Sequence, residues 1–314
     1  MTEKREDLVR VFKKKCNDYL SSFEGTRSEA SFIGRVFHNI QVYGPSYLFL
    51  QLCRFRVRGL FWNTTIRLFN GKTMILPVSD IGTHIFGMHG ILPHRSERKL
   101  TFWFLRNLTP NDIFYDIGAH LGFYTALASE MIRSGSVHSF EPNEKLCKYL
   151  EKNFSDTKNV YINCTAVSSE AGMIDFYDLT NILDSSVNSR FNMTGQKITP
   201  KRVPAVSIDQ YVRDGNKPPS VMKIDVEGGE YDILCGGKRT IQQYKPQIIM
   251  EILSESGSQE RTRKAVDTLL EFGYRAFFIR NEGFVESKET HDPVQRVMDL
   301  GGNERANVLF IPKT

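Results

Sequence analysis

The pattern of hydrophobic and polar positions changes near residue 110. In the first stretch the apolar residues recur every three to four positions, which is typical of one face of an amphipathic helix; they are Leu8, Phe12, Cys16, Tyr19, Leu20 and Phe23. Between Leu60 and Leu76, two β-rich runs flank Asn70-Gly71, a pair that favours a hairpin turn. A further helix is expected around Lys99–Asn107.

After Asn111 short apolar runs alternate with helix-like stretches. The runs predict strands at Ile113–Ile117, Val137–Phe140, Val160–Ala166, Val221–Val226, Gln247–Leu253, Arg275–Ile279 and Asn307–Ile311. The helix-like stretches are Leu121–Ile132, Glu144–Phe154, Gly229–Tyr244 and Arg261–Phe272. This alternation predicts an α/β fold with a parallel sheet covered on both faces. The last two strands have no clear helix between them, so one of them is expected to return antiparallel.

Residues 171–206 interrupt the alternation with two short β-like pieces around a polar stretch. This insertion has the character of a lid or substrate loop, and a plain surface loop is an equal alternative. We therefore predict two parts: an N-terminal helical and hairpin extension, 1–110, and a main domain, 111–314, that carries the insertion.

Charge supports this division. Residues 1–110 hold 17 Lys and Arg against 8 Asp and Glu, whereas residues 111–314 hold 24 against 28. The basic first helix is expected to pack on its own domain or on a second copy, with contact to an anionic membrane face as the alternative. The longest apolar run, Tyr47–Cys53, is far shorter than the roughly 20 residues that span a bilayer.

The five cysteines are scattered and contain no Cys-x-x-Cys pair. We therefore expect free thiols in a reducing cytoplasm. Peripheral attachment at the inner membrane face is left open.

The string DIGAHLGFYT, which begins at Asp116, runs from a buried strand through glycines into a helix. Such a turn directs backbone N–H groups and the positive end of the helix towards a ligand. A dinucleotide site would need glycine at position 120, where this chain has His120. Asp116, next to Gly118 and Gly122, would repel phosphate but accept hydrogen bonds from an ammonium group, which favours S-adenosylmethionine.

The following strand ends in Glu141, 23 positions after Gly118. A carboxylate there is placed to accept both ribose hydroxyls of an adenosine, and capping of the next helix is the structural alternative. Ala166 and the residues after it would then flank the adenine.

In the fourth strand, alternation places Lys223, Asp225 and Glu227 on one side. An internal Lys223–Asp225 ion pair is the structural interpretation. The functional interpretation is that Asp225 and Glu227, joined by Glu251 from the neighbouring strand, face the methyl acceptor and orient or remove its proton. These carboxylates would also suit a divalent cation, but no dedicated ligand cage is present, so no metal site is predicted.

Several strings together, DIGAHLGFYT, FEPN, KIDVEGGE, PQIIMEIL and ANVLFIPK, resemble FkbM-type S-adenosylmethionine-dependent methyltransferases over residues 80–314. The resemblance implies a class I methyltransferase sheet of seven strands with the last one antiparallel. It also implies O-methylation of a sugar hydroxyl in a glycan, glycolipid or secondary metabolite. His120 departs from the asparagine usual in the family.

Two other function classes remain open from the sequence: an NAD-dependent oxidoreductase and a non-catalytic methyltransferase-like binding module. The carbohydrate acceptor is preferred over nucleic acid, because no RNA-binding signature is present. A homo-oligomer is left open.

Overall fold

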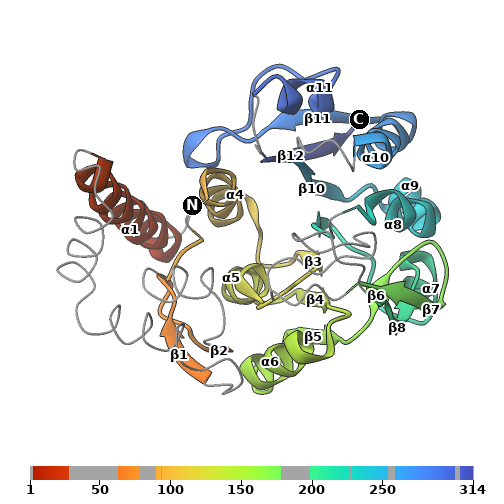
Figure 1. Ribbon diagram of the computed structural model, residues 1–314, viewed down its shortest axis with the longest axis horizontal. Coiled ribbons are helices and arrows are strands. Elements are labelled where there is room, and N and C mark those ends of the chain that lie inside the picture. Colours follow the sequence, from red (N-terminus) through yellow and green to blue (C-terminus); the bar gives the residue numbers. More distant parts are fainter. Residues whose placement is uncertain are drawn as a thin grey trace. The chain divides into compact units, whose positions relative to one another are not determined.

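The computed structural model describes residues 3–27, 63–77, 90–92, 94–177, 199–226, 228–253, 259–300 and 305–313 (Figure 1). The chain divides into two compact units, Met1–Arg98 and Lys99–Thr314. The division falls inside the helix α4 (Arg95–Asn107). The presence of α4 confirms the helix expected around Lys99–Asn107. The proposed boundary after residue 110 stays a prediction.

The first unit contains the predicted helix and hairpin. On α1 (Glu3–Arg27), Leu8, Phe12 and Cys16 are buried, and the Phe12 ring lies 4.7 Å from that of Phe69. The strands β1 (Asn63–Arg67) and β2 (Thr73–Pro77) pair antiparallel. Asn70-Gly71 forms the turn between them, and Gly71 takes the left-handed conformation, with φ of 88°, that favours this dipeptide.

The second unit is built on a seven-stranded sheet with the order β11-β12-β10-β9-β3-β4-β5. All neighbours are parallel except β12 (Arg305–Pro312), which is antiparallel to both β10 (Gln247–Leu253) and β11 (Tyr274–Phe278). The remaining strands are β3 (Ile113–Ile117), β4 (Ser136–Phe140), β5 (Val160–Asn163) and β9 (Val221–Ile224). The expected sheet with its antiparallel last strand is thereby confirmed.

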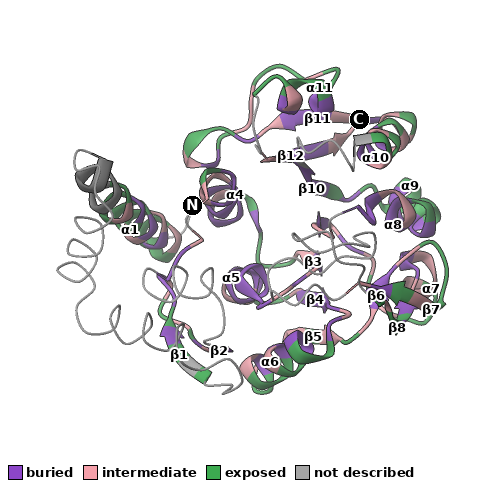
Figure 2. Ribbon diagram, in the orientation of Figure 1, coloured by how far each residue is buried: buried purple, intermediate pink, exposed green. Residues whose placement is uncertain are grey.

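Helices cover both faces of this sheet (Figure 1). On one face lie α4, α5 (Phe123–Met131) and α6 (Glu144–Phe154); on the other lie α8 (Glu230–Gly236), α9 (Lys238–Tyr244) and α10 (Gln259–Glu271). Because side chains alternate along β3, Phe114 packs on Phe104 of α4, whereas Tyr115 and Ile117 enter the larger core on the opposite face. Figure 2 shows these central strands as buried.

The structure differs from the predicted elements in four places. The third strand ends at Asn163, and Ala166–Val167 instead form β6 in a second sheet with β7 (Gly172–Phe176) and β8 (Lys201–Val206). The helix expected at 229–244 is two helices, α8 and α9. Between β11 and β12 lie a short 3-10 turn, Asn281–Gly283, and α11 (Pro293–Met298). α7 (Ile208–Arg213) follows β8.

The two β-like pieces of the insertion are thus β7 and β8, whereas its centre, 178–198, lies outside the described residues. The expectation of free thiols is wrong for Cys147 and Cys164, which form a disulfide. Cys16 and Cys235 are free. No helix within the described ranges is long and apolar enough to cross a bilayer.

Candidate active site

The turn between β3 and α5 lies against the end of β9. Gly118 has φ of 81°, and a Cβ there would overlap with the carbonyl oxygen of Asp225. The N–H groups of Gly118 and Ala119 both donate to the carbonyl of Phe140, each at 3.0 Å. Only glycine combines this conformation with so close an approach of two backbone segments.

Gly122 plays a similar part at the start of α5. Its φ is 85°, and a Cβ would come within 2.6 Å of Leu150 and 2.8 Å of Phe154 on α6. His120, between the two glycines, also has positive φ, at 52°. The turn is therefore held in one shape by β9 on one side and α6 on the other.

Asp116 is a buried carboxylate whose hydrogen bonding is incomplete. Its side chain is 1% exposed, and Oδ2 accepts a 2.7 Å hydrogen bond from Thr125 Oγ1, which also lies 2.7 Å from Ser139 Oγ. Among the described residues, Oδ1 has no hydrogen-bond partner. Burial raises the pKa of Asp116, and the nearby Lys223 opposes that rise. A buried oxygen without a donor is costly, so this position is suited to a cationic hydrogen-bond donor.

Glu141 lies at the end of β4 and connects the glycine turn with α6. Its Oε2 accepts from the backbone N–H of His120 at 2.9 Å, and its Oε1 accepts from that of Asn143 at 2.8 Å. The Asn143 side chain in turn caps α6. The sequence did not separate a capping role of Glu141 from a ligand role. In the structure Asn143 is the cap, Glu141 accepts from the N–H of that cap residue, and the ligand role of Glu141 stays a prediction.

The strand β9 places Lys223 close to two carboxylates, those of Asp116 and Asp225. In the β3–β9 ladder Lys223 lies directly opposite Asp116. Its Nζ donates to Asp225 Oδ2 at 2.7 Å and lies 5.0 Å from the centre of the Tyr124 ring. The Lys223 side chain is 3% exposed, whereas that of Asp225 is 28% exposed. The internal ion pair is thus present, and Asp225 still reaches solvent.

The pKa of Asp225 reflects this pairing. Burial alone would raise it, but the attraction and hydrogen bond of Lys223, with smaller contributions from Arg305 and His120, outweigh burial and hold the pKa below its usual range. Asp225 is therefore ionised at neutral pH. A carboxylate in this state accepts hydrogen bonds well but binds a proton weakly.

Glu251 and Arg305 lie with Lys223 and Asp225 at the carboxyl edge of the sheet, and these four residues are called the charged edge below. Ile224 is aligned with Met250 in the parallel β9–β10 ladder, so Asp225, which follows β9, and Glu251, which lies near the end of β10, are at the same edge of the sheet. Arg305 Nε lies 3.6 Å from Glu251 Oε1, and 40% of the Arg305 side chain is exposed. The sequence interpretation missed Arg305, although the antiparallel last strand, which begins at this edge, was a signal for it.

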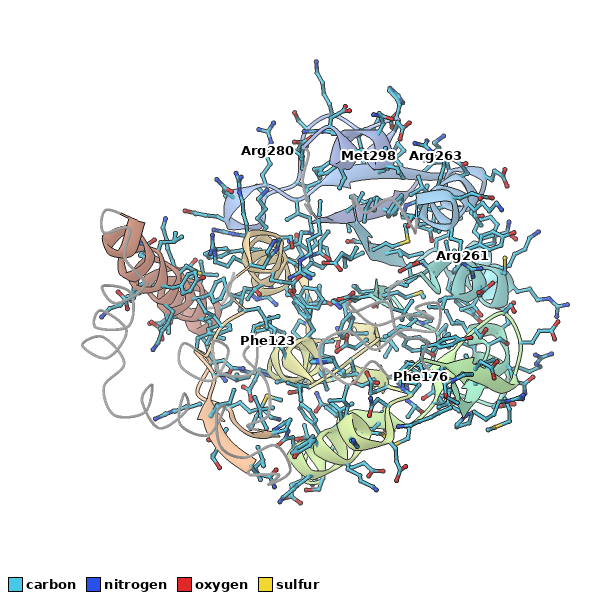
Figure 3. The ribbon with its side chains drawn as sticks, viewed as in Figure 1. Phe123, Phe176, Arg261, Arg263, Arg280 and Met298 are labelled. Carbon is cyan, nitrogen blue, oxygen red and sulfur yellow. A yellow bond between two sulfur atoms is a disulfide. The ribbon has the colours of Figure 1, made fainter. Side chains whose placement is uncertain are left out.

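Glu230, the first residue of α8, is another buried carboxylate. Its Oε1 accepts from the N–H of Gly228 at 2.9 Å, while Oε2 has no partner within the described part of the chain. Burial raises the pKa of Glu230. Arg261 on α10, labelled in Figure 3, fixes the same segment, because its Nε donates to the Gly228 carbonyl at 3.0 Å.

Two predicted site residues are not brought to this edge by the described structure. Glu227 lies outside the described residues. Ala166 is buried in β6, where it pairs with Ala205 of β8 in the second sheet. Within the described ranges, three potential metal-binding atoms come within 4.8 Å of one another at Cys147, Glu151 and Cys164, a group that includes the disulfide. The donor and acceptor roles of the named residues stay predictions.

The strand order, the antiparallel β12 and the glycine turn at the carboxyl edge define a class I methyltransferase fold. The family described as "Methyltransferase FkbM domain" matches residues 116–276, just over half of the chain. The chain belongs to this family, and the protein is a methyltransferase.

A curated relative, the hexuronic acid methyltransferase AglP of Haloferax volcanii, is 26% identical over 152 residues. The alignment covers 47% of this chain and 59% of the relative, so the chain spans less than two thirds of that protein.

Two solved structures are similar at low identity. The methyltransferase FkbM from Methylobacillus flagellatus KT has a TM-score of 0.43 and 14% identity, covering 70% of this chain and 51% of that one. Fibrillarin from Aeropyrum pernix, solved with bound S-adenosyl-L-methionine, has a TM-score of 0.37 and 12% identity, covering 68% and 73%.

Proposed function

We propose that this methyltransferase uses S-adenosylmethionine to methylate a hydroxyl oxygen of a sugar in a glycan, glycolipid or secondary metabolite. The observation that carries the donor assignment is the buried Oδ1 of Asp116 near the carboxyl end of β3, which has no hydrogen-bond partner in the part of the chain that the structure describes. The ammonium group of the donor's amino-acid portion would supply that hydrogen bond. Gly118 and Gly122 leave room beside it, and Glu141 would accept from the ribose.

The same residues argue against a dinucleotide. A pyrophosphate would bring negative charge towards Asp116, and the side chain of His120 occupies the position where close approach to phosphates needs glycine. We therefore prefer a methyl donor over NAD. The charged edge at Asp225 and Glu251 disfavours a purely binding role, since such a role does not need these carboxylates.

For the reaction, the bound donor supplies an electrophilic methyl group on a positively charged sulfur. The protein must align the acceptor oxygen and accept its proton. We assign the orientation of the hydroxyl to Asp225, because it is ionised, partly exposed and held by Lys223. Proton removal is then assigned to Glu227 or Glu251. No step requires a metal ion in this proposal.

The acceptor class rests on two supports. The relative AglP is named for hexuronic acid, a sugar with a carboxylate. At the edge of the site, the partly exposed Arg305 offers a positive charge beside Glu251, which suits an anionic sugar better than a neutral one.

Donor binding is tested by calorimetry with S-adenosylmethionine and S-adenosylhomocysteine, with NADH as the competing ligand. Asp116→Asn should weaken donor binding at least about tenfold, as expected for loss of a charge-assisted hydrogen bond. Asp267→Asn, which removes an exposed carboxylate on α10, is the matched control. Binding of NADH alone would overturn the proposal.

Transfer is tested with donor labelled on the methyl group and three acceptor sets: uronic-acid oligosaccharides, neutral oligosaccharides and RNA. Label should enter the sugars, with the uronic acids preferred. Label that enters only RNA, or donor binding without transfer to any set, would refute the sugar assignment.

We further infer that the basic face of α1 serves an anionic partner. Its apolar face is used inside the first unit, whereas Lys13, Lys14 and Lys15 are exposed. A cytoplasmic location with contact to the inner membrane face, and a homo-oligomer, stay predictions. Co-sedimentation with phosphatidylglycerol vesicles should fall when these three lysines are replaced by glutamine; no sedimentation of the unmodified protein would exclude the membrane surface as that partner.

A further inference from the structure

The disulfide between Cys147 and Cys164 joins two segments that each contact Glu141. The two cysteines are 17 positions apart, and their Cα atoms are separated by 5.6 Å. Cys147 lies in α6 and is buried; Cys164 is exposed in the connection between β5 and β6. The bond therefore fixes a helix to a strand connection.

The helical segment supports the site through two contacts. The N–H of Asn143, the cap of α6, donates to Glu141 Oε1 at 2.8 Å. Farther along α6, the side chains of Leu150 and Phe154 lie so close to Gly122 that a Cβ there would come within 2.6 Å and 2.8 Å of them. A shift of α6 would therefore change the contacts of both Glu141 and the glycine turn.

The connection that holds Cys164 also supports Glu141. The N–H of Glu141 donates to the carbonyl of Asn163 at 3.1 Å, and Asn163 Nδ2 donates to the carbonyl of Ser139 at 3.2 Å. Cys164 follows Asn163 directly. Both cysteines thus lie on segments that contact Glu141, the residue predicted to bind the ribose.

The two sulfur atoms differ in a way that suits reversible exchange. Cys164 is open to attack from solvent, and its sulfur lies 3.5 Å from the Glu151 carboxylate. Cys147 is buried, so a thiolate from solvent reaches the sulfur of Cys164 first and Cys147 is the leaving group.

In the exchange, a small-molecule thiolate attacks Cys164, a mixed disulfide forms, and Cys147 leaves as thiolate. A second thiolate attacks the sulfur of the small molecule and releases Cys164. The protein gains two thiols, and two small-molecule thiols become one disulfide.

We propose that Cys147 and Cys164 form a reversible oxidation site that controls donor binding. The disulfide holds α6 and the β5–β6 connection around Glu141, and reduction loosens them. This inference rests on the proposed function, because it assumes that the adenosine part of the donor binds beside Glu141.

The test measures S-adenosylhomocysteine affinity by calorimetry before and after reduction with a phosphine, with the linked peptide verified by mass spectrometry. If the reduced segments hold the competent arrangement about a tenth of the time, affinity falls about tenfold. The Cys147→Ser/Cys164→Ser variant should bind weakly with or without reductant. Cys235→Ser, which removes an exposed free thiol, should respond to reduction like the unmodified protein.

Hydrogen exchange provides a measurement that needs no ligand. Reduction should lower the protection of residues 163–167 and of the first turn of α6. Equal affinity and equal protection in the two redox states would overturn the oxidation site while leaving the proposed function intact. Absence of S-adenosylhomocysteine binding in both states would refute the proposed function, and the donor-binding switch with it.

Discussion

Replacing Lys223 with methionine tests how the charged edge is held together. Lys223 is 3% exposed, donates to Asp225 at 2.7 Å and lies opposite Asp116 in the sheet, so its removal leaves two carboxylates without their nearest cation. Breaking a buried pair on one side costs about 3–5 kcal/mol. Because Asp225 is 28% exposed and regains some hydration, we expect a loss of about 3 kcal/mol, near the lower end of that range.

The free energy of unfolding is measured by urea titration at pH 7. The control is Lys264→Met, which removes the partner of Glu260 in an exposed i,i+4 pair on α10 and should change the free energy of unfolding far less, because solvent screens this pair. A second variant, Lys223→Met combined with Asp116→Asn and Asp225→Asn, should recover much of the loss, because no unpaired charge is left in the site.

The change of the Lys223→Met stability deficit with pH is a second test of the same reasoning. The pKa of Asp225 is lowered in the folded protein, so the stabilisation from its pairing is present above the ordinary aspartate pKa and is lost as the pH falls through the folded-state value. The deficit of Lys223→Met should therefore shrink in acid, as the carboxylates take up protons. A deficit below about 1 kcal/mol at pH 7, or one that grows in acid, would refute the reasoning.

Three further predictions concern the turn, a buried histidine and the acceptor edge. Gly118→Ala should lower the free energy of unfolding in urea by more than about 2 kcal/mol, because the new Cβ overlaps with Asp225 and the φ angle is strained for alanine. The control Gly215→Ala, at positive φ but with nothing within 4 Å, should cost only about 1 kcal/mol. Equal losses in the two variants would contradict the close approach of Gly118 to Asp225. Burial lowers the pKa of His138 to about 4, so stability should fall by about 3 kcal/mol between pH 6.5 and pH 4, where only the unfolded state gains the proton; an unchanged slope in His138→Asn would exclude this group as the cause. Asp225→Asn and Glu251→Gln should each reduce methyl transfer at least about a hundredfold with donor affinity changed less than about threefold; full turnover in both variants would remove them from the reaction.

Local patterns predicted the elements that local chemistry specifies. Asn70-Gly71 marked the hairpin, and the apolar runs marked the strands of the main sheet, because a strand buried on both faces has little polar alternation. The predictions that were wrong concern features that depend on contacts with segments distant in the sequence. The expected single helix breaks at Gly236 and Gly237, since a Cβ at Gly236 would overlap with the carbonyl of Ser168.

The disulfide is a failure of the same kind. Cys147 and Cys164 carry no motif, and they meet only because β5 returns the chain alongside α6. A scattered set of five cysteines gave no sign of this. The strand predicted to reach Ala166 stops earlier because Asn163 uses its side chain to bind the Ser139 carbonyl and the chain then turns into the second sheet.

The charge balance of the site depends on strand direction. In a parallel sheet every carboxyl end lies at one edge, so Asp116 in β3, Glu141 after β4, Asp225 after β9 and Glu251 in β10 all lie towards that edge and concentrate negative charge there. The antiparallel β12 is the exception, because its amino end lies at that edge, and it carries Arg305 to within 3.6 Å of Glu251. Lys223 provides the other positive charge from inside the sheet, beneath Asp225. Because β12 runs opposite to its neighbours, it places a cation beside Glu251 that no parallel strand end provides among the described residues.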